Sequence, residues 1–167
     1  MLKPNGEERL QAAVHTTPLP EPNGANGPFT AFFYGTLQMA PEVLFSVIYG
    51  QKKPGKVFED LHTINPAILN GHVRRRVSFA DYPGVVPQEG ESVRGMYVTG
   101  LTDANIGRLD VFEGVEYVRR KVQVRLIETD EVKETETYIY LHPDHLEKGE
   151  WDFEHFKKEK LALWSRA

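Results

Sequence analysis

The sequence of 167 residues contains no cysteine. Disulfide bonds, thiolate metal sites and cysteine nucleophiles are therefore excluded, and this composition suits a reducing compartment. Long apolar runs are also missing, because no stretch approaches the ~18 residues that cross a bilayer. The N-terminus shows no apolar core of a signal peptide. We expect a soluble, cytoplasmic protein without a membrane partner.

Positive charge is in short supply as well. The chain has 20 Lys and Arg residues against 24 Asp and Glu, a net charge of −4, whereas nucleic-acid-binding domains are usually basic. We therefore expect no nucleic-acid partner. Arg74, Arg75 and Arg76 would point alternately to opposite faces of a predicted strand. This run predicts surface charge rather than one phosphate-binding patch.

Several common catalytic and ligand-binding motifs are absent. The sequence contains neither a phosphate loop ending in Gly-Lys-Ser/Thr nor a Gly-x-Gly-x-x-Gly motif, and it has no Gly-x-Ser-x-Gly nucleophile elbow. His142 and His145 flank Pro143, which indicates a loop, whereas a metal site needs ligands that converge from fixed elements. The sequence thus predicts no metal site and no serine-hydrolase chemistry.

The composition changes near residue 28. Residues 1–28 are rich in Pro, Gly and Asn and poor in apolar side chains. Such a segment cannot bury enough surface to offset the entropy of ordering. We predict a disordered N-terminal arm over 1–28 and one domain over 29–167, which is long enough for a hydrophobic core.

Secondary structure is predicted from apolar periodicity and turn signals. In chain order we predict a strand at Phe29–Tyr34, a helix at Pro41–Tyr49, a strand at Pro66–Ser78 with a bulge at Asn70–Gly71, a turn at Tyr82–Gly84, a strand at Ser92–Thr99, a helix capped by Thr102 or Asp103, a strand at Tyr117–Glu128 with a bulge near Arg120, a strand at Glu134–Leu141 and a helix at Trp151–Trp164. Several strands with few helices and short turns favour antiparallel pairing and the α+β class. A small closed or nearly closed sheet with helices outside fits this pattern best.

Glu113 is the most informative single residue. It lies in the last turn of a predicted helix, between the aromatic Phe112 and Gly114. The negative end of the helix dipole and an apolar neighbour both disfavour an ionised carboxylate. The position therefore predicts a raised pKa and a proton shuttle. The alternative is that Gly114 simply ends the helix and Glu113 faces water.

A second candidate segment, Tyr34 to Leu37, follows the first predicted strand. Gly35 allows a sharp turn or the close approach of a ligand to the backbone. Successive N–H groups in such a turn can form an anion-binding nest. An ordinary loop between a strand and a helix is the alternative.

Taken together, Tyr34–Leu37 and Leu109–Arg120 resemble the γ-glutamylcyclotransferase-like family. Three further segments, Tyr82–Pro87, Val93–Val98 and Trp151–Phe153, are similar to its plant avirulence-induced branch. The resemblance covers roughly residues 29 to 164. It implies a small mixed, mostly antiparallel β-barrel with flanking α-helices.

The resemblance also implies an activity. Characterised members of the family convert a γ-glutamyl compound into 5-oxoproline and a free amine. It implies that Glu113 is the catalytic acid/base, that a γ-glutamyl small molecule is the substrate, and that no cofactor or metal takes part. It assigns substrate binding to Tyr34, Gly35, Thr36, Leu37 and Tyr117.

This chemistry needs no nucleophilic side chain, because the α-amine of the substrate attacks its own γ-carbonyl. One carboxylate with a raised pKa can remove a proton from that amine and then protonate the leaving amine. Two other hypotheses remain open on the sequence. One is a non-catalytic module that binds a small ligand on the same fold. The other is a scaffold that acts through the N-terminal arm or the C-terminal helix.

Overall fold

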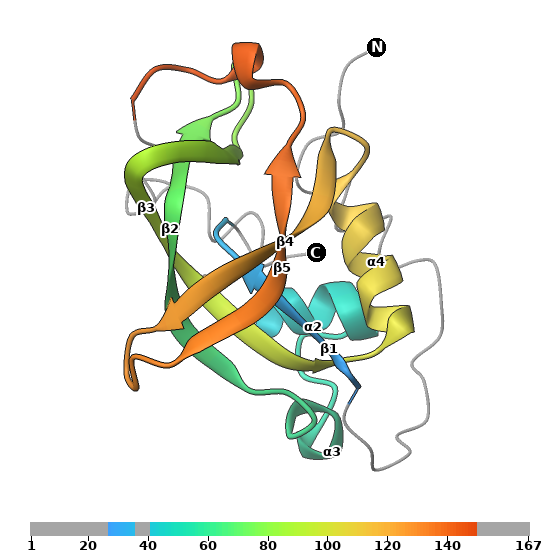
Figure 1. The fold of residues 1–167 in the computed structure, drawn as a ribbon. Helices are drawn as coiled ribbons and strands as arrows, with labels where there is room; N and C mark the ends of the chain where they lie inside the picture. Colours follow the sequence, from blue (N-terminus) through green and yellow to red (C-terminus); the bar gives the residue numbers. More distant parts are fainter. Residues whose placement is uncertain (1–26, 36–40, 150–167) are drawn as a thin grey trace.

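The computed structural model describes residues 27–35 and 41–149. It contains β1 (Phe29–Phe33), α2 (Pro41–Tyr49), α3 (Lys56–Glu59), β2 (Ile64–Arg76), β3 (Pro83–Leu101), α4 (Asp103–Glu113), β4 (Tyr117–Leu126), β5 (Val132–Tyr140) and the short 3₁₀ helix η2 (Pro143–His145) (Figure 1). The predictions for residues 1–26, for Thr36 and Leu37, and for the helix at Trp151–Trp164 lie outside these described residues.

The five strands form a closed barrel in the order β1-β3-β2-β4-β5. Every described strand pair is antiparallel except β1 with β5, which run parallel where Phe32 pairs with Thr137. The helices α2 and α4 contact each other beside the barrel (Figure 1). The predicted α+β class and the mixed, mostly antiparallel barrel with flanking helices are therefore confirmed.

Two hydrophobic clusters follow from the alternation of side chains along the strands. Phe32 and Tyr34 belong to a cluster that otherwise consists of residues from β2, β3 and β4, and this cluster fills the barrel. Ala31 and Phe33 point the other way, into a second cluster that includes the buried faces of α2 and α4. Burying one large apolar side chain contributes about 1.5–3 kcal/mol to the stability of the fold. The second cluster therefore holds α2 and α4 against β1.

Both ends of α4 are set by capping residues that can be recognised in the sequence. Thr102 caps the helix, since its side chain accepts the N–H of Asn105 while the Asn105 side chain accepts the N–H of Thr102. The helix ends at Gly114, whose φ of 86° is a conformation that glycine adopts readily. This confirms the predicted cap and places Glu113 as the last helical residue.

Two predictions about turns and bulges are wrong. Tyr82–Gly84 is not a turn, because β3 already begins at Pro83. Gly84 serves packing instead, since a Cβ there would lie 2.8 Å from the Cβ of Tyr140. No bulge occurs near Arg120, because β4 and β5 pair without a shift from Tyr117 to Arg125. Arg120 interrupts the apolar pattern as an exposed residue of a regular strand.

The predicted bulge at Asn70–Gly71 is confirmed. The register between β2 and β3 shifts between Asn70 and His72, and Gly71 has a φ of 75°. Such a bulge moves the following side chains to the other face of the strand. This change of face determines the orientation of Arg74, which lies in the candidate site.

Candidate active site

Tyr34 stands directly after β1, with its side chain buried in the barrel cluster. Its hydroxyl donates to the carbonyl oxygen of Tyr138 at 2.5 Å. Burial, and then the negative charge of Glu113, raise the pKa of Tyr34 well above its usual value, while Arg74 acts in the opposite direction. The phenol is therefore a neutral, fixed group at the start of the Tyr34–Leu37 segment.

The expectation that Arg74 is a surface charge is wrong. Only 7% of this residue is exposed, and its Nη1 donates to the carbonyl of Tyr34 at 2.8 Å and to that of Arg94 at 3.3 Å. The bulge at Asn70–Gly71 explains the error. After it, Val73 packs into the helix-side cluster, so the next residue in the strand points toward the barrel. Arg74 thus holds the backbone where the Tyr34–Leu37 segment begins.

Glu113 is half-buried at the end of α4. Its charge raises the pKa of both Tyr34, which follows β1, and Tyr138 of β5, so Glu113 lies within electrostatic reach of both phenols. For Tyr138, burial is the largest cause, followed by Glu113 and then by a hydrogen bond to Asp110. The structure therefore brings Glu113 and Tyr34 into one neighbourhood, although 79 positions separate their numbers in the sequence.

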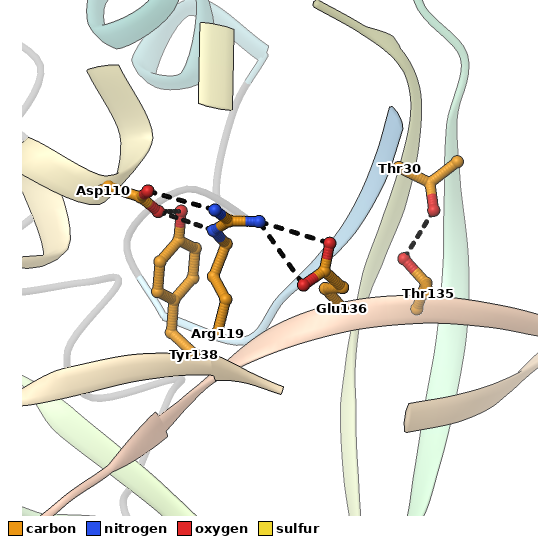
Figure 2. Close-up of polar contacts among 6 residues, drawn as sticks. All are labelled: Thr30, Asp110, Arg119, Thr135, Glu136 and Tyr138. Atoms are coloured by element: carbon orange, nitrogen blue, oxygen red, sulfur yellow. Dashed lines mark hydrogen bonds and ion pairs between the residues drawn. The ribbon is translucent and has the colours of Figure 1, made fainter. Parts of the chain in front are cut away.

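A polar network fixes the end of α4 that carries Glu113. Figure 2 shows Asp110 of α4 accepting hydrogen bonds from Arg119 Nε at 2.8 Å and from the Tyr138 hydroxyl at 2.7 Å. Arg119 Nη1 also donates to Glu136 Oε1 at 3.2 Å. The hydrogen bond to Asp110 is the main reason that the pKa of Arg119 is raised. Because Asp110 and Glu113 are three positions apart, they share a face of the helix.

The parallel seam beneath this network is held by threonines. Thr30 and Thr135 hydrogen bond through their hydroxyls at 2.7 Å (Figure 2), and Thr137 donates to the carbonyl of Phe32 at 2.9 Å. These contacts join β1 to β5 just before Tyr34 leaves the sheet. The position of the Tyr34 backbone is consequently set by both neighbouring strands and by Arg74.

Gly35 and Tyr117 meet at Pro83. A Cβ on Gly35 would lie 3.5 Å from Pro83 Cγ, which is an ordinary contact. The buried Tyr117 donates its hydroxyl to the Pro83 carbonyl at 2.7 Å and packs edge-on against Tyr140, with ring centroids 5.2 Å apart. Tyr117 therefore lies beside the segment that the resemblance assigns to substrate binding. Its role in substrate binding stays a prediction, as do the roles of Tyr34, Gly35, Thr36 and Leu37.

Glu116, the second carboxylate near the end of α4, has a different environment. Its Oε2 accepts the hydroxyl of Tyr140 at 2.9 Å. Glu113 is instead the carboxylate whose charge acts on Tyr34 and Tyr138. The different surroundings of Glu113 and Glu116 favour Glu113 as the candidate acid/base. The sequence alone does not distinguish the two residues, because they lie three positions apart in the same motif.

Three residues of this neighbourhood were missed by the sequence analysis. Asp110 carried a usable signal, because it precedes Glu113 by three positions on the predicted helix. Arg119 and Tyr138 carried none, since their contacts with Asp110 depend on the register of β4 and β5 beside α4.

The described residues give no sign of a metal centre or a membrane span. Across 27–35 and 41–149, no three His, Asp or Glu side chains gather in a way that could hold a metal ion. Within the same ranges, every helix is too short or too polar to cross a bilayer.

Comparison with known proteins agrees with this architecture. The family model described as "Gamma-glutamyl cyclotransferase, AIG2-like" matches residues 31–153. AIG2-like protein D of Arabidopsis thaliana is 40% identical over 131 residues, which are 77% of this chain and 79% of the relative. AIG2-like protein C of the same species is 35% identical over 131 residues, covering 78% of this chain and 70% of the relative.

Solved structures show the same fold. A solution structure of an Arabidopsis thaliana protein superposes with a TM-score of 0.63 at 26% identity, covering 85% of this chain and 81% of the other. A structure described as a gamma-glutamyl cyclotransferase superposes with a TM-score of 0.51, covering 67% and 66%. At 18% identity, this second likeness shows the fold alone.

Proposed function

Since this chain belongs to the "Gamma-glutamyl cyclotransferase, AIG2-like" family, we propose that it is an enzyme that converts a γ-glutamyl amino acid or γ-glutamyl amine into 5-oxoproline and a free amine. The observation that carries the proposal is the placement of Glu113 within electrostatic reach of Tyr34, the first residue of the Tyr34–Leu37 segment. A half-buried carboxylate and a row of backbone N–H groups are the parts that this reaction needs.

The first step is ring closure within the substrate. The α-amine attacks the γ-carbonyl carbon, a C–N bond forms, and the carbonyl oxygen becomes an oxyanion. Attack within one molecule needs no encounter between two reactants, so the contribution of the protein is to hold the substrate in the folded-back conformation with the reacting atoms aligned. The fixed backbone at Tyr34, held by Arg74 and by the β1–β5 seam, supports this positioning role.

Proton transfer is assigned to Glu113. Its carboxylate takes the proton that the attacking amine loses and gives it to the leaving nitrogen as the original amide C–N bond breaks. Net proton balance is zero, so the enzyme returns to its starting state. Backbone N–H groups of Gly35, Thr36 and Leu37 are the proposed donors to the oxyanion, a contribution of about 2.7–4 kcal/mol per donor in comparable sites.

Product analysis tests the proposal directly. Purified protein is incubated with a panel of γ-glutamyl dipeptides and γ-glutamyl-lysine, and the amounts of 5-oxoproline and of released amine are measured. The proposed reaction predicts equal amounts of the two products. Glu113→Gln removes the proton-transfer group while keeping the size of the side chain. Glu116→Gln is the matched control, because it changes the neighbouring carboxylate that binds Tyr140.

We expect product from the wild type and from Glu116→Gln, and none above background from Glu113→Gln. Folded protein that yields no 5-oxoproline from any member of the panel would overturn the proposal. Thermal stabilisation by a γ-glutamyl compound without turnover would instead identify a module that only binds the ligand.

A further inference from the structure

The barrel is closed between β2 and β4 by a short pairing only. These strands pair at only two positions, Ala67 with Leu126 and Ile68 with Arg125. β2 continues to Arg76 and β4 begins at Tyr117, and the two strands diverge there (Figure 1). No other strand within residues 27–35 and 41–149 pairs with β2 or β4 along this gap. One edge of the middle of β4 therefore has no strand partner among the described residues.

A groove occupies this gap. Its volume is about 750 Å³, and its floor is apolar, formed by Leu69, Val122, Val124 and Ile139. Leu69 and Val124 are members of the barrel cluster, and the other two pack against it. The floor is thus rigid and offers apolar surface to an added side chain.

The rim of the groove is basic. Arg120, Lys121, Arg125 and His72 line it, against the single carboxylate of Glu134. Arg125 is already paired with Asp130 at 2.7 Å. Arg120 and Lys121 are exposed, and neither forms an ion pair with any other described residue. Positive charge therefore remains available at the edge of β4, in a chain whose overall charge is negative.

We propose that the free edge of β4, from Val118 to Val124, binds an acidic peptide in an extended conformation as an added strand. Main-chain hydrogen bonds would supply affinity, and alternate side chains of the peptide would reach the apolar floor and the basic rim. β4 is assigned rather than β2, because β4 keeps an unbroken register with β5 whereas β2 is bulged after Asn70. A bulge distorts an edge and disfavours pairing.

The charges at this edge select the class of partner. Exposed Lys and Arg on an edge strand prevent pairing between identical strands, because two such strands repel each other. The same side chains favour a strand of opposite charge. A second copy of this edge is therefore excluded as the occupant, and a peptide that alternates acidic and apolar residues fits both the rim and the floor.

A labelled peptide of about seven residues, a usual strand length, tests the proposal on the full chain. The probe alternates glutamate and valine, and its binding is followed by fluorescence anisotropy. Two controls keep its length: one replaces glutamate with lysine, and one carries an N-methyl group on every internal backbone amide, so that neither edge of the peptide can pair. The protein variants are Arg120→Glu/Lys121→Glu and a matched charge reversal far from the groove, Lys52→Glu/Lys53→Glu.

We expect saturable binding of the acidic probe and none of the lysine or N-methylated peptides. Arg120→Glu/Lys121→Glu should weaken binding by about tenfold, and Lys52→Glu/Lys53→Glu by less than about twofold. Amide hydrogen exchange of the wild type should slow along Val118–Val124 when the probe is added, a readout that needs no variant.

Three results would overturn the proposal. Equal binding of the N-methylated peptide would show that strand pairing is not involved. Equal binding of an oligonucleotide of the same charge would show simple ion exchange. The absence of binding and of slowed exchange at saturating probe would show that this edge accepts no such strand.

Discussion

Neighbouring residues of β4 differ in how their polar groups are used. At its start, Arg119 is held by Asp110 and Glu136, which locks the strand against α4 and β5. The next two residues, Arg120 and Lys121, line an open groove beside an edge that no described strand pairs with. One regular strand can therefore carry both a fixed support for a candidate site and an open edge, because successive parts of its length meet different neighbours.

The strongest effect is expected on activity, at the end of α4 that Arg119 of β4 supports. Glu113→Gln should lower turnover of a γ-glutamyl substrate by about 10²- to 10⁴-fold, the usual contribution of a general acid–base. Its thermal stability should stay close to that of the wild type, because the side chain is only half-buried. Steady-state kinetics and thermal melts of the same preparation check this. A variant that keeps more than about a tenth of the activity would remove Glu113 from the reaction.

Arg74→Met should give the next largest effect, on stability. The change leaves the carbonyl oxygens of Tyr34 and Arg94 without their guanidinium donor inside the barrel. Unsatisfied buried polar groups cost about 1–3 kcal/mol each, so we expect a loss of about 2–4 kcal/mol in urea unfolding. Arg76→Met is the matched control, because Arg76 lies at the exposed end of the same strand. Equal effects of both variants would contradict the buried role of Arg74.

Asp110→Asn tests the network that supports Glu113. It should lower stability by about 1 kcal/mol, because it removes the carboxylate that accepts both Arg119 and Tyr138. Asp60→Asn breaks the surface-exposed pair with Lys56 and should cost less than about 0.5 kcal/mol. Chemical unfolding of both variants measures the difference. If the two losses are the same, the network is no stronger than a surface ion pair.

His62 should make the stability of the fold depend on pH. Its ring lies between the Tyr49 hydroxyl at Nε2 and the Thr99 carbonyl at Nδ1, and burial lowers its pKa. The unfolded chain therefore binds this proton more readily, and stability should fall as the pH drops below about 6.5 and through the lower pKa of the folded state. Unfolding free energies at pH 7 and pH 5 should differ less for His62→Gln than for the wild type. An unchanged pH dependence would contradict this assignment.

The smallest effect is expected at the open edge. Lys121→Glu should change stability by less than about 0.5 kcal/mol, because the side chain is exposed and forms no ion pair within the described ranges. Thermal melts beside Asp110→Asn check this. A loss as large as that of Asp110→Asn would mean that the edge contributes to the fold, and the contrast between the two parts of β4 would disappear.

The local signals in the sequence predicted the local parts of the fold. The helix at Pro41–Tyr49 was predicted with its observed bounds, and the cap at Thr102 was predicted from the side chain that performs it. Where a residue serves a distant neighbour, the prediction was wrong. Gly84 looked like a turn residue but allows close packing of Tyr140, and α3 had no periodicity long enough to recognise.

The candidate site was predictable to the extent that it lies in short motifs. Tyr34 and Glu113 were singled out from the residues around them, and the structure brings them together. Arg74 could not be assigned, because its orientation depends on the irregularity at Gly71, where one residue of β2 lies opposite four residues of β3. The partners of Asp110 are likewise set by strand register, which a single sequence does not encode locally.

The parallel contact between β1 and β5 also constrains the order of assembly. Thr137 donates a hydrogen bond to the carbonyl of Phe32, which lies 105 positions earlier in the chain. The barrel can therefore close only when both β1 and β5 have been synthesised. A ribosome releases β1 long before β5. Until then the backbone beside Phe32 has no second neighbour, and such late, long-range closure is slow and leaves the young chain open to wrong pairing. Protection of this first strand during synthesis is the resulting biological requirement.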